Sequence, residues 1–246
     1  MAQNTGNAKN ILVGASPLFI SNIDVTAGSA YKENAEPGTA FAGAYVSGES
    51  YTKTLNDITP GSTFAYRNVG FTNNGLQITY NPTYDSVTVD QLLDTAKLFK
   101  SAMEVMIATE MSEGTLENVL VVFGQSDDPA ATTISNTNTI IEESGFSTGT
   151  ANTKKTLGLA AGALGIAPTE RQLIAVGNAP STTDGSNNKS TERIYYARRV
   201  LSVQQSQFTL ARSTPTTFPV TFRLLPTAMS GYEGQEYGKI IDRVLA

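Results

Sequence analysis

Residues 76–90 read LQITYNPTYDSVTVD and carry the clearest structural signal in the chain. In the first half of this stretch, apolar and polar side chains alternate strictly: Leu76, Gln77, Ile78, Thr79, Tyr80 and Asn81. Alternation with a period of two predicts a β-strand with one covered face and one solvent-exposed face. Val87 and Val89 stand at the opposite parity, so we expect a bulge or a tight turn near Asp85 and Ser86. The stretch therefore predicts a long strand that bends.

Similar strand patterns occur along the whole chain. They cover residues 11–20, 23–25, 64–71, 104–111, 172–176, 194–203, 208–210, 218–225 and 237–245. The first of them is expected to pair at the edge of the fold, and Asn73, Asn74 and Gly75 form a turn signal ahead of the long strand. Residues 92–99 fit a helical turn or a buried loop equally well. Because 246 residues can bury a substantial core, we predict a mainly β fold, as one large domain or two smaller ones.

One helix is predicted beside this sheet, over residues 112–124. Its apolar residues recur at positions i, i+3, i+4 and i+7 and form one stripe: Leu116, Val119, Leu120 and Phe123. Ser112 or Thr115 can cap the N-terminus, and Gly124 can end the helix. We interpret the stripe as helix packing against the sheet rather than as a cofactor site.

Three polar segments separate these elements. Residues 27–61 are rich in Gly, Ser, Thr and Asn and are predicted to form a long loop or a hairpin arm. Residues 125–155 are predicted to be an extended surface loop or a hairpin, and residues 178–191 a turn-rich loop. Loops as long as 27–61 in a compact domain often have a function, so this arm is a candidate contact segment.

The charge pattern excludes some partners and suggests others. A net charge of −5 disfavours tight binding to nucleic-acid phosphates. No basic residue lies between Lys100 and Lys154, and the same stretch is rich in acids: Glu104, Glu110, Glu113, Glu117, Asp127, Asp128, Glu142 and Glu143. A later stretch is rich in arginine: Arg193, Arg198, Arg199, Arg212 and Arg223. These are either ordinary solvated faces or opposite patches that steer head-to-tail association.

The chain contains no cysteine and no histidine. It therefore has no thiol nucleophile or thiolate metal site, and it lacks the usual general base and the commonest metal ligand. The acidic pairs at residues 127–128 and 142–143 lack the spacing of a calcium loop. No run is long and apolar enough to cross a bilayer, and the N-terminus has no signal-peptide pattern. We expect no enzyme activity, no catalytic, cofactor or metal site, and no membrane partner.

Several of these patterns, in their order along the chain, resemble the tail tube (major tail) proteins of long-tailed bacteriophages. The segments that carry the likeness are GLQITYNPTY at 75–84, VTVDQ at 87–91, LFK at 98–100, the strand at 104–111, TLENVL at 115–120, FPVTFR at 218–223 and YGKIIDR at 237–243. The likeness covers most of the chain, apart from the polar segments near 125–155 and 178–191.

This resemblance implies a single domain over residues 1–246, a β-sandwich or barrel-like fold flanked by a helix. Six copies would form a ring whose inner strands join into one barrel. Rings stack into a tube in the virion tail, which is assembled in the host cytoplasm. The implied partners are other copies of the chain, a tape-measure protein, a tail terminator and distal tail or baseplate proteins, with DNA passing through. The arm at 27–61 becomes the candidate contact to the next ring, with Phe41, Tyr45 and Tyr51 as aromatic anchors.

The same resemblance places the long strand and its neighbour in the inner sheet. Six copies at −5 each carry −30 formal charges, and a negative lumen repels phosphate, so that DNA slides without sticking. The residues expected to face the lumen are Gln77, Thr79, Asn81, Asp85, Asp90, Glu104 and Glu110. The competing assignment of the acids is the outer surface.

A monomeric all-β binding module, of adhesin or carbohydrate-binding type, is the alternative function. Such a module shares the polar loops and the lack of catalytic residues. The absence of Trp argues against sugar stacking, although Tyr and Phe can replace it. Self-assembly into rings or tubes separates the two functions.

Overall fold

The computed structural model describes residues 14, 16–21, 66–90, 94–125, 140–144, 153–159, 169–180, 191–203, 206–210, 212–227 and 231–244. Within these residues the chain is mainly β with one helix, as predicted. The elements are β1 (Leu18–Ser21), β2 (Tyr66–Asn68), β3 (Thr72–Thr88), β4 (Thr95–Met111), α2 (Leu116–Val122), β5 (Ile140–Ser144), β6 (Thr153–Leu157), β7 (Arg171–Asn178), β8 (Thr191–Ser202), β9 (Phe218–Leu224) and β10 (Gly238–Val244).

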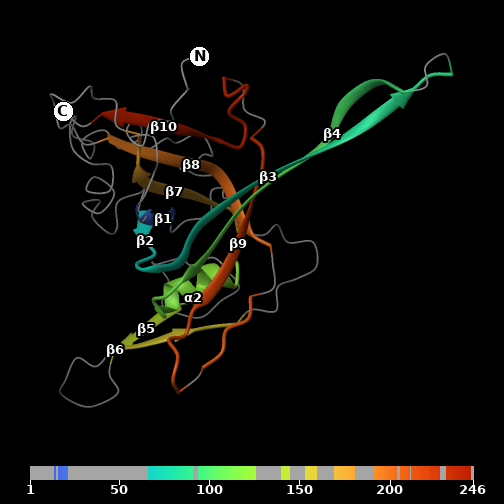
Figure 1. Cartoon of the computed structure of the whole chain (residues 1–246). Helices are drawn as coiled ribbons and strands as arrows, with labels where there is room; N and C mark the ends of the chain where they lie inside the picture. Colours follow the sequence, from blue (N-terminus) through green and yellow to red (C-terminus); the bar gives the residue numbers. More distant parts are fainter. Residues whose placement is uncertain are drawn as a thin grey trace.

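Eight strands form one antiparallel sheet in the order β2-β1-β7-β8-β9-β4-β3, with β10 also paired to β8 (Figure 1). The branch arises because β8 changes partner along its length. It pairs with β10 as far as Ala197, opposite Gly238, and then with β9 from Val200, opposite Leu224. The sheet therefore turns at β8 into two layers, one made of β2, β1, β7 and β10 and the other of β9, β4 and β3. In the described part of the chain the sheet is not closed into a barrel.

The main core lies where these two layers and the helix meet. Leu18 and Leu173 enter it from the first layer, Ile107 and Phe222 from the second, and Leu120 from α2. Burial of such side chains is worth roughly 1.5–3 kcal/mol each. A smaller cluster on the other face of the first layer includes Phe19, Ile174, Tyr196 and Ile194.

β3 and β4 form a hairpin that extends well beyond this core. Each strand has 17 residues, which corresponds to roughly 55 Å at the usual rise per residue. Only the half near the body is covered, because Val105 and Ile107 of β4 are buried whereas residues 95–102 are all exposed. Figure 1 shows this ribbon projecting from one side of the body.

Register shifts flank Asp85 and Ser86, close to the predicted bulge, but the extra residues lie on the partner strand and not on β3. Thr83 pairs with Ala102 and Tyr84 with Lys100, so β4 bulges at Ser101. β3 keeps its strict alternation from residue 77 to residue 87. A bulge in β3 and a bulge in β4 would both change which residues of the two strands share a face. Only the pairing of both strands shows which of them holds the extra residue.

The predicted turn at residues 73–75 is also a bulge, inside β3. Asn73 pairs with Glu110 and Gln77 with Ala108, so β3 holds two more residues than β4 in this interval. Asn74 has φ 61° and the next glycine φ 68°. Residues with positive φ occur in bulges as well as in hairpin turns, and here the strand continues through both of them.

Other strand predictions were confirmed, moved or refuted. The strands predicted at 104–111, 172–176, 194–203, 218–225 and 237–245 correspond to β4, β7, β8, β9 and β10. β1 pairs with β2, the strand at the end of the described order, and with β7 on its other side, so it lies next to the edge rather than at it. Residues 95–99 belong to an exposed strand, neither helix nor buried loop, and residues 208–210 form no strand.

The helix has the predicted capping residues. The Thr115 hydroxyl accepts a hydrogen bond from the backbone N–H of Asn118 at 3.2 Å. Gly124 has φ 66°, and the N–H of Gln125 reaches back to the carbonyl of Leu120 at 3.1 Å. This is the usual glycine-ended helix C-terminus.

The predicted apolar stripe of α2 is correct only in part. Leu120 is buried, and Leu116 and Val119 pack against the main core. Phe123 is 41% exposed, because the helix ends at residue 122 and its ring lies instead 6.4 Å from that of Phe208. The stripe also omits three buried residues: Asn118, Val121 and Val122.

The long polar segments are described in part. Within 125–155, Glu142 pairs with Lys155 and Glu143 with Lys154 in the β5–β6 hairpin, which confirms the hairpin alternative. The predicted arm at 27–61, with Phe41, Tyr45 and Tyr51 as anchors, lies outside the described residues. Residues 181–190 of the predicted loop at 178–191 also lie outside them.

Candidate functional site

One face of the β3–β4–β9 layer points away from the main core. Paired residues on neighbouring strands place their side chains on the same face, and the opposite face carries the buried Val105 and Ile107. The residues of the outward face, which we call the open face, are Gln77, Thr79, Asn81, Thr83 and Asp85 of β3, Phe99, Ala102, Glu104, Met106, Ala108 and Glu110 of β4, and Pro219, Thr221 and Arg223 of β9.

The structure brings six of the seven predicted lumen-facing residues together on this open face. They come from two strands that are adjacent in space and share one parity, which is why a period-two pattern identified them. The seventh, Asp90, lies in the turn beyond β3. The structure thus groups these residues, while their exposure to a lumen stays a prediction.

The open face is much less negative than the chain as a whole. The Arg223 guanidinium lies 3.8 Å from the Glu104 carboxylate, and Glu110 accepts a hydrogen bond from the Asn73 amide at 3.2 Å. Lys97, opposite Val87, continues the same face toward the hairpin tip. The face therefore has three carboxylates against two cations, a net charge of −1. The total of −30 expected for six copies does not describe this surface.

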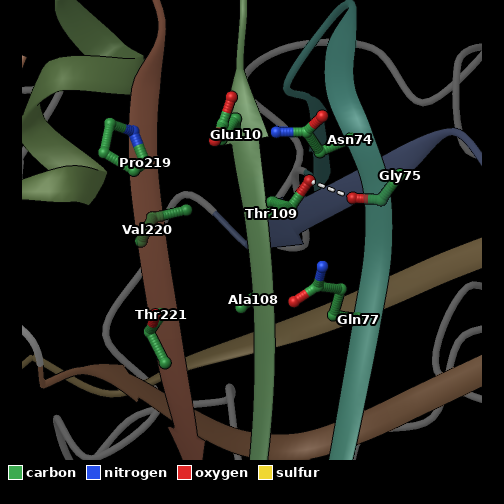
Figure 2. A pocket seen from close by; sticks show the side chains of 9 residues that line it. All are labelled: Asn74, Gly75, Gln77, Ala108, Thr109, Glu110, Pro219, Val220 and Thr221. Carbon is green, nitrogen blue, oxygen red and sulfur yellow. Dashed lines mark hydrogen bonds between the residues drawn. The ribbon is translucent and has the colours of Figure 1, made fainter.

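A shallow hollow of about 140 Å³ opens on this face beside the bulge of β3 (Figure 2). The bulge is held by the Thr109 hydroxyl, which donates a hydrogen bond to the carbonyl of Gly75 at 2.9 Å. Glu110 is the one ionisable side chain among its lining residues, and its other polar residues are Asn74, Gln77, Thr109 and Thr221. One carboxylate makes no catalytic pair. No cluster of three metal-ligating side chains occurs among the described residues either.

The core-facing side of the hairpin exposes three large apolar side chains after it leaves the body, with Lys100 opposite Tyr84 and Ser86 opposite Leu98. Tyr80, Tyr84 and Leu98 are 63%, 58% and 65% exposed. Tyr80 pairs with the buried Val105, and the Ser101 bulge brings Leu98 onto the same side as Tyr84. We call these three residues the overhang. They continue the stripe of the main core into solvent.

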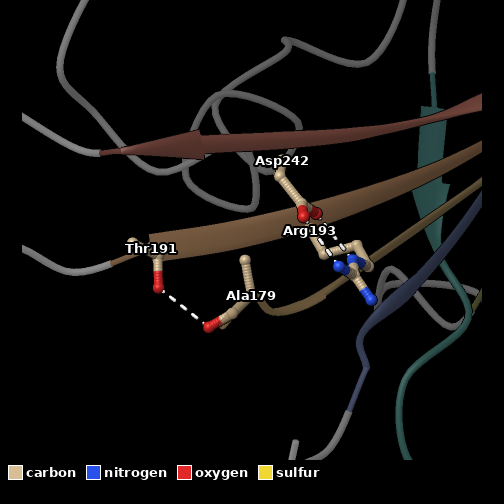
Figure 3. A network of polar contacts seen from close by, with 4 residues as sticks. All are labelled: Ala179, Thr191, Arg193 and Asp242. Carbon is tan, nitrogen blue, oxygen red and sulfur yellow. Dashed lines mark hydrogen bonds and ion pairs between the residues drawn. The ribbon is translucent and has the colours of Figure 1, made fainter. Parts of the chain in front are cut away.

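The predicted basic patch does not exist as a free surface. Arg193 forms two hydrogen bonds with the Asp242 carboxylate at 2.6 Å each (Figure 3), which lower the pKa of Asp242. Arg199 holds Glu170 in the same way, at 2.6 and 2.8 Å. These acids come from other segments of the chain, so the sequence alone did not show the pairing.

Arg198, another member of that predicted patch, is completely buried. Its guanidinium carbon lies 4.0 Å from the ring centre of Tyr232 and 5.3 Å from that of Tyr196. Its Nε donates a hydrogen bond to the carbonyl of Gln235 at 3.1 Å. Stacking on aromatic rings makes the residue a structural clamp between β8 and the segment that precedes β10.

Sequence reasoning missed a buried polar network between α2 and the β2–β3 connection. The Asn118 side chain is fully buried; its amide donates to the carbonyls of Val69 and Glu113 at 2.9 and 2.8 Å. Its oxygen accepts a hydrogen bond from Arg67 at 2.6 Å. Burial lowers the pKa of Arg67, and the carboxylates of Glu117 and Glu113 oppose that shift. A polar residue inside an apolar helix was the available signal.

Within the described part of the chain, no helix is long and apolar enough to span a membrane. The chain matches no protein-family model and no curated protein.

Proposed function

We propose that this chain is a non-enzymatic structural protein that assembles into stacked, six-membered rings, the tail tube of a long-tailed bacteriophage, through which DNA passes. The observation that carries the proposal is the projecting β3–β4 hairpin. One side of it is mostly polar with a small net charge, and the other side exposes the overhang. Its place is the virion tail, and its partners are other copies, a tape-measure protein, a tail terminator and distal tail proteins.

The hairpin supports the self-assembly proposal because such a ribbon has little stability of its own when it is exposed to water. A two-stranded ribbon without a covering layer is marginally stable in water. Tyr80, Tyr84 and Leu98 lie in a contiguous stripe rather than singly, and such stripes mark interaction sites. Covering this stripe with protein from another copy removes it from water.

The free edges of the sheet support a ring. β2, β3 and β10 each have one paired side in the described part of the chain. Unpaired strand edges invite association, and closed assemblies remove them. Two different edges on one chain allow a head-to-tail contact, which gives a ring when its rotation closes.

The open face suits a conduit for DNA. Gln77, Thr79, Asn81 and Thr221 present amides and hydroxyls without charge. A surface with net charge −1 gives no counterion-release gain to a bound phosphate backbone, so DNA is not retained. Low adhesion therefore follows from few cations rather than from a strongly negative lumen.

The first test is assembly. The purified chain is expected to form rings or tubes in negative-stain electron microscopy, and a Tyr80→Asp/Tyr84→Asp variant is expected to sediment as a monomer, because two charges cannot be buried unpaired in an apolar contact. Leu159→Asp, at a residue 75% exposed beyond β6, is the matched control and should still assemble. A strictly monomeric wild-type chain at high concentration would contradict the proposal and favour the binding module.

The second test addresses the conduit. Thr79→Lys/Asn81→Lys adds cations to the open face, so DNA delivery by particles with tails of normal length is expected to slow by about 10-fold or more at low salt. The delay should shrink at high salt because counterion release weakens. Ser213→Lys, at an exposed residue off this face, is the control. Unchanged delivery by the double variant would refute the lumen assignment.

A further inference from the structure

Two apolar surfaces continue the main core beyond the region where its layers overlap. The first is the overhang on the β3–β4 layer. The second lies on the other layer, where Ile240 of β10 is 64% exposed and pairs with Tyr195 of β8. Tyr195 packs against the main core, whereas Ile241 packs against the smaller cluster on the opposite face. Ile240 is therefore on the core side of its layer but largely exposed.

The second surface has a polar border. Arg193 and Asp242 are paired across β8 and β10 on the same side as Tyr195 and Ile240, with side chains 25% and 49% exposed. Apolar residues at the centre and a satisfied ion pair at the margin are the usual arrangement of a protein interface. We call these four residues the β10 patch.

Both surfaces stay exposed in the single chain. β10 begins beside the hairpin, where the Tyr237 hydroxyl donates a hydrogen bond to the carbonyl of Met103 at 3.5 Å. It then runs away from the hairpin tip (Figure 1). Each surface is one layer of a sandwich that lacks its second layer at that point, and a hydrophobic sheet face is normally covered by another layer.

We propose that the overhang of one chain covers the β10 patch of a second copy, with both core faces directed toward each other. The contact is heterologous, because the two surfaces differ, so each added copy leaves one overhang and one β10 patch free. This gives the direction of growth around the ring and rests on the proposed function.

The size of the overhang agrees with this occupant. Its exposed side chains, together with Ile78 at 45% exposure, present roughly 500 Å² of apolar surface, against about 800 Å² per partner in a standard interface. Backbone and border contacts account for the remainder. A small ligand would cover far less of a stripe that extends along several residue pairs.

Complementation between two charged variants tests the direction of the contact. Leu98→Asp blocks the overhang and leaves the β10 patch intact, and Ile240→Asp does the reverse. Each variant alone is expected to stay monomeric, whereas an equimolar mixture is expected to form dimers, and nothing larger, in analytical ultracentrifugation. Ile240→Asp that assembles like the wild type, or a mixture that stays monomeric, would overturn the proposal.

Cysteine pairing tests the contact itself, since the natural chain has no cysteine. Assembled mixtures of Leu98→Cys and Ile240→Cys chains are expected to give a disulfide-linked dimer under mild oxidation, and mixtures of Leu98→Cys and Leu159→Cys are not. Rings without the first product, or with both products equally, would overturn this contact while leaving ring assembly intact. Absence of rings from the wild-type chain would instead refute the proposed function.

Discussion

Gly238→Ala is expected to detach β10 from the sheet and to lower the free energy of unfolding by about 3 kcal/mol or more. An added Cβ would lie 2.0 Å from the carbonyl oxygen of Tyr196, and the glycine has φ 145°. The obstacle is backbone in the middle of β8, which is itself paired on both sides. Neither strand can move aside without losing its hydrogen bonds.

Hydrogen exchange locates this effect. The amides of residues 239–242 should lose protection by roughly 100-fold, while those of β7 are affected less. Gly231→Ala is the matched control, because that glycine also has a positive φ, 94°, but has no atom within 4 Å of an added Cβ. Its cost is expected to be about 1 kcal/mol from backbone strain alone. Equal losses from both variants would show that φ, and not the close approach to Tyr196, limits this position.

Asn118→Leu is expected to cost about 3–5 kcal/mol of stability. The change leaves the buried carbonyls of Val69 and Glu113 without their amide donor and removes the oxygen that Arg67 reaches. A buried polar group without a hydrogen-bond partner destabilises the fold by more than one hydrogen bond stabilises it. The leucine side chain is also larger than the asparagine side chain, which is fully buried at this site.

Urea denaturation followed by circular dichroism measures this loss. Asn73→Leu provides the same chemical change at an exposed residue with one surface hydrogen bond, to Glu110. That control is expected to lie within about 0.5–1 kcal/mol of the wild type. A loss at position 118 no larger than at position 73 would mean that the network contributes nothing beyond surface polarity.

Local patterns predicted those elements whose covered face follows a regular period. The alternation at 104–111 identified the buried side of β4, and Thr115 and Gly124 marked the helix ends. Phe123 was misplaced because its position depends on where the helix stops and on a ring 85 residues away, that of Phe208. Periodicity describes one element and contains no information on its neighbours.

The candidate site divides in the same way. Parity grouped Gln77, Thr79 and Asn81 correctly, because a strand places alternate residues on one face. The arginines were interpreted wrongly, because Asp242 and Glu170 reach Arg193 and Arg199 only through strand pairing. The −30 charge of six copies stays a prediction about the whole ring, since net charge contains no information on which charges share a surface.

From composition and period alone, the chain is a mainly β domain with one capped helix and a long half-covered strand, because these properties depend on local backbone preference and side-chain alternation. The folded chain alone showed that β4 carries the bulge, that the hairpin extends past the core, and that Tyr80, Tyr84 and Leu98 remain exposed there. Register and exposure depend on contacts between segments far apart in the chain, and each such contact is set by the packing of the whole sheet.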